Sequence, residues 1–196
     1  MTIETQTRDI FLETLLKDIP RQIENLRSVR ETFLTDAVLL GEIPSPTFGE
    51  QERIRLVMDR FRENGLEEPT LDEFGNASGT IPGSSGESAI LVTAHADSVF
   101  SAEIRHVLEV GSDHITGPGI ADNSIGLAAV VALPKLLEHL NIKFKEDLIL
   151  LANVKSLGRA NLEGARGFLD TLRRPVRAGI CVEGASQGRL SYSGLG

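Results

Sequence analysis

The chain has 196 residues, of which 41% are hydrophobic and 24% are charged, and its formal net charge at pH 7 is -8. This length suits one domain, and the composition is that of an ordinary globular protein. The acidic balance argues against nucleic acid and anionic membrane surfaces as partners, because both bind basic patches.

The amino-terminal segment carries no visible targeting signal. Residues 1–9 are polar and include acids, without the basic start and apolar stretch of a signal peptide. No window approaches 18 consecutive apolar residues, so we expect no transmembrane helix and a cytoplasmic protein. Cys181 is the single cysteine, so an intramolecular disulfide is excluded.

The first 65 residues are predicted to be mainly helical. Apolar residues recur at three- and four-residue steps through residues 9–35, and Pro20 is expected to start a second helix within that range. Thr47 and Glu50 have the spacing of a capping box, which predicts Thr47 as the N-cap of the next helix. That helix is expected to stop at Asn64 and Gly65.

The remaining sequence alternates strand and helix patterns. Continuous apolar runs predict three strands buried on both faces, at Ala89–Thr93, Asp147–Ala152 and Ala178–Val182. Helices are expected at 122–140 and 162–172, a hairpin around residues 111–112, and short strands at 71–74, 77–81 and 189–193. This alternation predicts an α/β fold layered around a largely parallel sheet.

Four polar residues fall at matching ends of these elements. His95 and Asp97 follow the first buried strand, Asp122 precedes an apolar helix, and Glu183 follows the third buried strand. In open α/β sheets, ligands bind beyond the carboxyl ends of the strands, which predicts a joint metal site. Each residue also has a simpler explanation: a surface histidine, a turn former, a helix N-cap and a solvated loop acid, respectively.

The order of these motifs resembles the M20 family of metallopeptidases. The segments that carry the resemblance are AHAD, GPGIADNSIGLAAVVAL, DLILLANV with NLEGARGFLD, and CVEG with GRLSYSGLG. The family comprises co-catalytic zinc exopeptidases and related deacylases, including peptidase T-like members. The resemblance implies a three-layer α/β/α sheet, mostly parallel with an antiparallel portion. It also implies a single domain over 1–196, with 1–42 as a helical lead-in and 43–196 as the family-like region.

The resemblance assigns roles to the same four residues. It implies that His95 binds one zinc ion, that Asp97 orients that imidazole, and that Asp122 bridges two metal ions. Glu183 would bind a metal, and the peptide between Asp122 and Asn123 would be cis.

The chain departs from the family pattern after its second buried strand. Two adjacent glutamates are expected there, the first as general base and the second as metal ligand, and Ser156 and Leu157 stand at those positions. Lys155 adds a positive charge beside them, which disfavours cation binding. The resemblance also implies a lid and a late histidine ligand, which we expect to be absent because the chain stops where the lid should begin.

These departures make the expected function a weakened form of the family's. The family cleaves peptide or acyl-amino-acid bonds with metal-activated water, whereas this chain is expected to be degenerate or truncated, with little activity alone. Weak or partial Zn²⁺ occupancy is expected, with Co²⁺ or Mn²⁺ as substitutes. The alternatives are a non-catalytic binding module, or one half of a split active hydrolase that a separate chain completes. Self-association is also expected, because the missing portion would leave apolar surface exposed.

Overall fold

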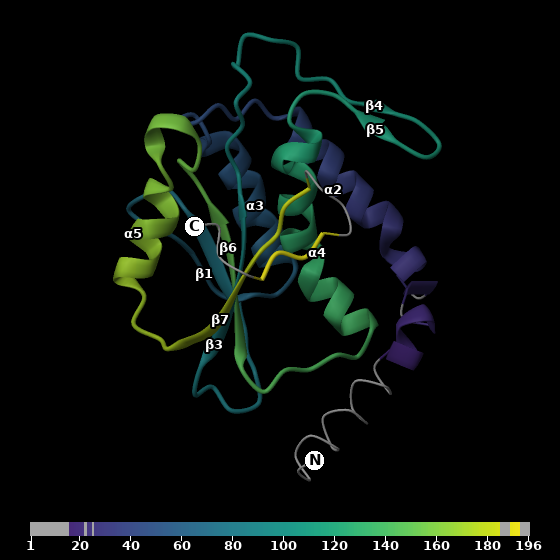
Figure 1. The fold of residues 1–196 in the computed structure, drawn as a ribbon, viewed down its shortest axis with the longest axis vertical. Coiled ribbons are helices and arrows are strands. Elements are labelled where there is room, and N and C mark those ends of the chain that lie inside the picture. Colours follow the sequence, from purple (N-terminus) through teal and green to yellow (C-terminus); the bar gives the residue numbers. More distant parts are fainter. Residues whose placement is uncertain (1–15, 22, 25, 185–188, 193–196) are drawn as a thin grey trace.

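The computed structural model describes residues 16–21, 23–24, 26–184 and 189–192. These residues form a five-stranded sheet with strand order β1-β2-β6-β3-β7 (Figure 1). The strands are β1 (Glu67–Leu71), β2 (Ala77–Ile81), β3 (Ala89–His95), β6 (Asp147–Asn153) and β7 (Val176–Cys181). β3 pairs in parallel with β6 and β7, whereas β2 is antiparallel to β1 and β6. The predicted mostly parallel sheet with an antiparallel portion is therefore confirmed.

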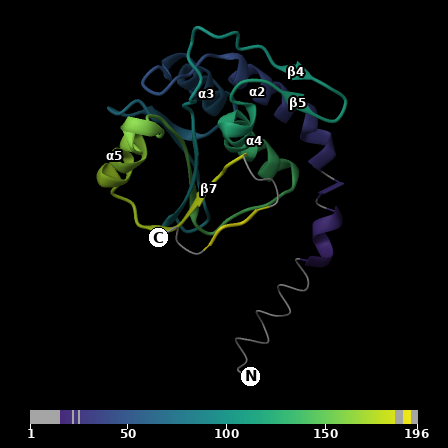
Figure 2. The same cartoon turned by 45° about the horizontal axis from the view of Figure 1, so that its top comes forward.

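Helices cover both faces of the sheet, as Figures 1 and 2 show. α3 (Gln51–Glu63) and α4 (Ile125–His139) pack against one face, and α2 (Arg30–Glu42) packs against α4. α5 (Glu163–Thr171) covers the other face. The larger core cluster lies beneath α2, α3 and α4 and contains Phe61, Leu127 and Leu150. A smaller cluster on the other face joins Phe168 of α5 to residues of β3 and β6. The molecule thus has the three α/β/α layers that the family resemblance implies.

The two central strands form where continuous apolar runs predict them. Every residue of β6 is buried, and β3 is buried or half-buried along its length. His95 at the end of β3 is in register with Asn153 at the end of β6. The carboxyl ends of neighbouring parallel strands therefore meet at one edge of the sheet, where the candidate site lies.

The prediction that the third strand is buried on both faces is wrong. β7 is exposed at all six positions, and Ile180 keeps 51% of its surface accessible. Within the described sheet β7 pairs only with β3, and none of its six residues belongs to either core cluster. Its apolar sequence cannot be buried without a neighbour, and Cys181 at its end is exposed.

The long apolar helix is the central helix of the core. The helix predicted from Asp122 begins at Ile125, after an irregular turn, η2 (Ile120–Ser124), with non-helical dihedral angles at Asp122 and Asn123. By length and composition alone the span Ile120–His139 is apolar enough to cross a membrane, with a mean hydropathy of 1.5. Half of that span is buried, and it packs against α2, β3 and β6, as a core helix does.

Several local predictions differ from the structure. Pro20 lies among helical residues 16–21, and the irregularity falls instead at the 3-10 turn η1 (Arg27–Val29); residues 9–15 lie outside the described part. β1 ends at Leu71 rather than starting there, and residues 189–192 form no strand. The hairpin is shorter than expected, with β4 (Glu109–Val110) and β5 (Ile115–Thr116), and a further 3-10 turn, η3 (Gly158–Ala160), precedes α5.

The predicted capping box is also wrong. α3 begins at Gln51 without a side-chain cap, and the Thr47 hydroxyl donates to Asp97 Oδ2 at 2.9 Å instead. A long-range bond to a buried carboxylate replaces the local cap that the spacing predicts.

Candidate metal centre

The structure brings together three of the residues that the sequence singles out. His95 ends β3, Asp122 lies in η2, and Glu183 follows β7. His95 Nε2 lies 3.1 Å from Asp122 Oδ1 and 3.4 Å from Glu183 Oε2. One potential ligand atom from each residue lies within 4.8 Å of the other two. The sheet edge and the η2 turn therefore build one cluster, whose metal role stays a prediction.

The hydrogen bond of His95 sets which ring nitrogen faces this cluster. Its Nδ1 lies 3.0 Å from the backbone carbonyl oxygen of Asp97. A carbonyl oxygen only accepts, so Nδ1 carries the hydrogen, and in the neutral ring the lone pair of Nε2 faces the two carboxylates.

This donor set fits a divalent metal ion. One imidazole nitrogen and two carboxylates make three protein ligands, the number that catalytic zinc sites have, with the remaining position open. His95 is 12% exposed, whereas Asp122 and Glu183 are 53% and 48% exposed, so the cluster is open to solvent on the carboxylate side. Among the described residues this is the one group of three or more such side chains.

The carboxylate of Asp97 ties the cluster to two other segments. Asp97 is fully buried, and its Oδ2 accepts hydrogen bonds from the Thr47 hydroxyl and from the backbone N–H groups of Ser156 and Leu157, each at 2.9 Å. Its Oδ1 lies 3.4 Å from His95 Nδ1. Both the carboxylate and the main-chain carbonyl of Asp97 thus contact the imidazole that the residue is predicted to orient.

The pKa values of the pair reflect these contacts. Burial by itself would raise the pKa of Asp97, but the contact with His95, the N–H of Leu157 and the Thr47 hydroxyl lower it to about 2. Burial likewise acts to lower the pKa of His95. The hydrogen bond and charge of Asp97, with the charges of Glu183 and Asp122, outweigh burial and raise that pKa. The first shift favours an ionised Asp97, and the second favours the protonated ring of His95.

The loop after β6 supplies backbone groups and no carboxylate. Ser156 is buried, and its hydroxyl accepts a hydrogen bond from Asn153 Nδ2 at 2.6 Å. Leu157 is half-buried and apolar. Lys155 Nζ pairs with Glu163 at 2.8 Å, so its charge is compensated and opposes a nearby cation less than the sequence suggested.

Asn123 is a site residue that sequence reasoning did not identify as a contact. Its Nδ2 donates to the carbonyl of Val182 at 2.8 Å, and its Oδ1 accepts from the N–H of Gly184 at 3.1 Å. These two bonds flank Glu183 on both sides and fix it beside Asp122. The peptide between Asp122 and Asn123 is cis, as predicted.

The residue after Glu183 must be glycine for this approach. A Cβ atom on Gly184 would lie 2.2 Å from Ile125 Cγ2 and 2.5 Å from the carbonyl oxygen of Ala121, closer than packed atoms allow. The glycine after Glu183 could thus have indicated a close contact from the sequence. No sequence feature indicated the two hydrogen bonds of Asn123.

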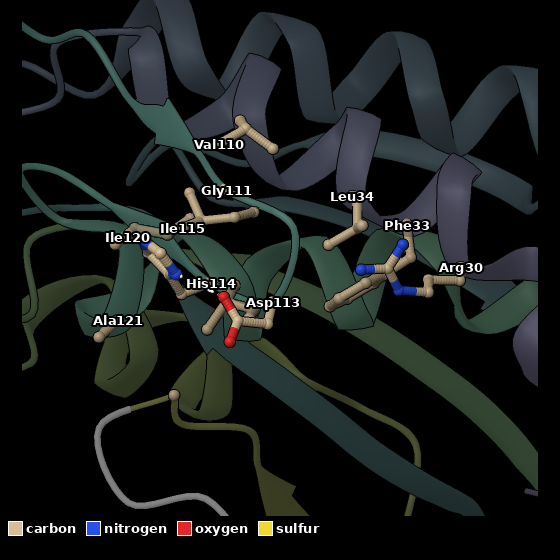
Figure 3. Close-up of a pocket in the computed structure, with 12 residues that line it drawn as sticks. Arg30, Phe33, Leu34, Val110, Gly111, Asp113, His114, Ile115, Ile120 and Ala121 are labelled. Carbon is tan, nitrogen blue, oxygen red and sulfur yellow. Dashed lines mark hydrogen bonds and ion pairs between the residues drawn. The ribbon is translucent and has the colours of Figure 1, made fainter.

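Figure 3 shows a groove whose lining residues are mostly apolar. It has a volume of about 450 Å³ and lies between α2, the β4–β5 hairpin and η2. Ala121 and Gly184, the neighbours of Asp122 and Glu183 in the chain, are among its lining residues. Its other walls are mainly apolar, with Arg30, Asp113 and His114 as the polar exceptions. The volume lies within the range of small-molecule sites.

Removing the Asn123 amide should disturb Glu183. In Asn123→Ala, the carbonyl of Val182 and the N–H of Gly184 lose their partner, so we expect the unfolding free energy to fall by about 1–3 kcal/mol. Zn²⁺ affinity should fall about tenfold, as for other residues that orient ligands. Denaturant unfolding and calorimetry measure the two effects. Gln51→Ala, which removes an exposed amide, is the control, and an unchanged affinity in Asn123→Ala would contradict the positioning of Glu183.

Comparisons with known proteins show the family and the fold. The model of peptidase family M28 matches residues 76–190, more than half of the chain. No curated protein sequence matches the chain.

Solved peptidase structures share the fold. Aminopeptidase PepT from Bacillus cereus ATCC 10987 superposes with a TM-score of 0.62 and 20% identity, covering 78% of this chain and 43% of its own. The Bacillus subtilis YXEP protein, a dinuclear metal binding peptidase from the M20 family, gives a TM-score of 0.59, 16% identity and coverages of 79% and 43%. Aminopeptidase APDkam598 from the archaeon Desulfurococcus kamchatkensis gives a TM-score of 0.64 and 14% identity, covering 82% of this chain and 66% of its own.

These comparisons correct the assignment to the M20 family. The chain spans 43% of the length of the first two of these structures. At such identities the M20 resemblance holds for the zinc-exopeptidase-like fold, whereas the sequence matches the model of a different family. The chain belongs to peptidase family M28.

Proposed function

We propose that this metallopeptidase-like domain holds one divalent metal ion on His95, Asp122 and Glu183 and has little hydrolytic activity alone. The observation that carries the proposal is the approach of three ligand atoms to within 4.8 Å of one another, with the free nitrogen of His95 facing the two carboxylates. Zn²⁺ is the first candidate because imidazole and carboxylate ligands suit it, and Co²⁺ or Mn²⁺ would substitute. A second ion, expected from the M20 resemblance, finds no further ligand group in the described residues.

The roles of the chain's own residues follow from their contacts. Asp97 holds the imidazole through Nδ1, and Asn123 holds Glu183 beside Asp122. A bound ion would supply Lewis acidity toward the carbonyl of a peptide or acyl-amino-acid bond. The substrate class is part of the proposal, as is a cytoplasmic location, and the apolar groove beside Asp122 and Glu183 would accept an apolar group of the substrate.

The weak activity follows from the loop after β6. The acids within ion-pair distance of His95 in the described residues are Asp97, Asp122 and Glu183, each of which already has a role. Ser156 cannot accept a proton from water near neutral pH, and Leu157 has no polar group. A general base typically contributes 10²–10⁴-fold to rate, so its loss predicts a defect of about that size.

The metal proposal is tested by titrating the metal-stripped chain with Zn²⁺ in a calorimeter. We expect one ion per chain, with binding abolished in Asp122→Ala and unchanged in Asp113→Ala, which removes an exposed acid of the hairpin. No binding by the wild-type chain, or binding that survives Asp122→Ala, would sink the proposed site.

The catalytic proposal is tested by restoring carboxylates to the loop. The double variant Ser156→Glu, Leu157→Glu should hydrolyse dipeptides and acyl-amino acids about 10²-fold or more faster than the wild type in the presence of Zn²⁺, because it regains a base. The amide variant Ser156→Gln, Leu157→Gln matches its size and should show no gain. A wild-type chain with chelator-sensitive turnover equal to that of the glutamate variant would show that the loop is not the limiting feature.

A second candidate function is partner binding at β7. β7 has an unpaired edge within the described sheet and is exposed on both faces, which is the arrangement that promotes strand pairing between chains. This supports a binding module, or a hydrolase completed by a second chain.

Sedimentation velocity tests the association. The wild-type chain should form concentration-dependent oligomers, Ile180→Lys should shift them to monomer by placing a charge on β7, and Val110→Lys in the hairpin should not. A wild-type chain that stays monomeric at high concentration would argue against this candidate.

A further inference from the structure

Two buried charged residues of the α3 region have no role in the proposed chemistry. Glu50, directly before α3, is 2% exposed, and Arg53 within it is 1% exposed. Neither belongs to the metal cluster, and they are not paired with each other by any short contact in the described residues. Burying a charge costs free energy unless hydrogen bonds compensate it, so their partners show what they hold in place.

Glu50 joins two turns on either side of the site. Its Oε1 accepts hydrogen bonds from the backbone N–H of Phe48 at 3.0 Å and of Lys155 at 2.8 Å. Phe48 and Lys155 have φ angles of 76° and 52°, in the left-handed region that non-glycine residues rarely occupy. One carboxylate oxygen therefore fixes two unfavourable backbone conformations, which persist only where the surroundings enforce them.

The second of these turns leads directly to the site. Ser156 and Leu157 follow Lys155, and their N–H groups donate to Asp97 Oδ2. The direction of those N–H groups depends on the turn at Lys155. Glu50 thus acts on Asp97 from the side of β6, through the backbone of the loop.

Arg53 acts on the same carboxylate from the side of β3. Its Nη1 donates to the carbonyl of Ala96 at 3.0 Å, and its Nη2 donates to the carbonyl of Ile43 at 2.7 Å. Ala96 is the residue between His95 and Asp97. Burial lowers the pKa of Arg53 to about 10, and the charge of Asp97 opposes that shift. The guanidinium therefore stays charged at neutral pH and holds the main chain between the two site residues.

We propose that Glu50 and Arg53 are positioning residues that fix the loops after β3 and β6 against each other and thereby set the metal affinity of the His95 cluster. This inference rests on the proposed metal site. The path runs from Glu50 through the N–H groups of Ser156 and Leu157 to Asp97, and from Asp97 to the Nδ1 of His95. Residues that orient metal ligands change affinity by 10–100-fold when altered, and Glu50 acts one contact further out, so about tenfold is expected.

The test measures Zn²⁺ affinity and thermal unfolding on full-length variants. Glu50→Ala should weaken Zn²⁺ binding about tenfold. Glu50→Gln keeps an acceptor oxygen for both N–H groups and should retain most of the affinity. The controls are Glu52→Ala, which removes an exposed acid on the same helix, and Val57→Ala, which truncates a buried core residue of α3 that has no hydrogen-bonding side chain. Val57→Ala should unfold at lower temperature and bind Zn²⁺ normally.

A purely structural role would give a different pattern. Affinity in Glu50→Ala equal to that of the wild type, or to that of Val57→Ala at matched stability, would overturn the proposal. If Glu50→Ala does not fold, Glu50→Asp takes its place, because it keeps the charge and is one methylene too short to reach both turns. Arg53→Lys should also weaken Zn²⁺ binding, since an ammonium group cannot donate to both carbonyls in the geometry of the guanidinium fork.

A metal-free measurement separates this inference from the metal site. In the apoprotein, amide hydrogen exchange at Lys155, Ser156 and Leu157 and the ring ¹⁵N signals of His95 report the same path. Glu50→Ala should speed that exchange and shift those signals, whereas Val57→Ala should not. If the wild-type chain binds no Zn²⁺ but these changes occur, the metal proposal fails and the positioning stands. If they do not occur, the positioning is overturned whatever the chain binds.

Discussion

The carboxylate of Asp97 is the constraint on which the rest of the site depends. It is fully buried and ionised, and it therefore needs donors that its own strand cannot provide. Those donors come from the segment before α3 and from the loop after β6, 50 and more residues away in the sequence. Satisfying one charge thus forces three distant segments to converge, and His95 lies where they meet.

The parallel sheet makes this convergence reproducible. β6, β3 and β7 are neighbours that point the same way, so the loops that leave their carboxyl ends all begin at one edge of the sheet. η2 adds Asp122 from the crossover connection, and Asn123 bonds it to the end of β7. The rigid layers set the ligand spacing, while the loops decide which chemical groups are present. In the loop after β6 those groups are the side chains and N–H groups of Ser156 and Leu157.

The parts of the fold that depend on local pattern could be predicted from the sequence. The apolar runs of β3 and β6 specify buried strands wherever two layers of helix cover them, and polar residues after such strands indicate a site. The same reasoning failed for β7, because burial depends on neighbours that a strand's own sequence does not reveal. It also failed for Thr47, whose hydroxyl is bonded 50 positions away rather than to the helix that comes next.

The roles of the supporting residues could not be predicted from the sequence, for a related reason. Asn123, Glu50 and Arg53 bond to main-chain atoms of remote loops, and any sequence presents the same N–H and carbonyl groups there. The residue types of Lys155 and Ala96 do not indicate that their backbone groups form such bonds. Contacts between two side chains can be inferred from complementary residue types in the sequence. Bonds from a side chain to the backbone leave no such pattern, because every residue offers the same backbone groups.

The exposure of Cys181 gives the molecule a built-in reporter. It is the chain's only cysteine, its side chain faces solvent on the open strand, and Glu183 lies two residues further on. A fluorophore or nitroxide attached to this thiol would therefore sit at a single defined point near the cluster. Quenching by a paramagnetic ion such as Mn²⁺ would turn that position into a distance, without any engineered residue in the chain.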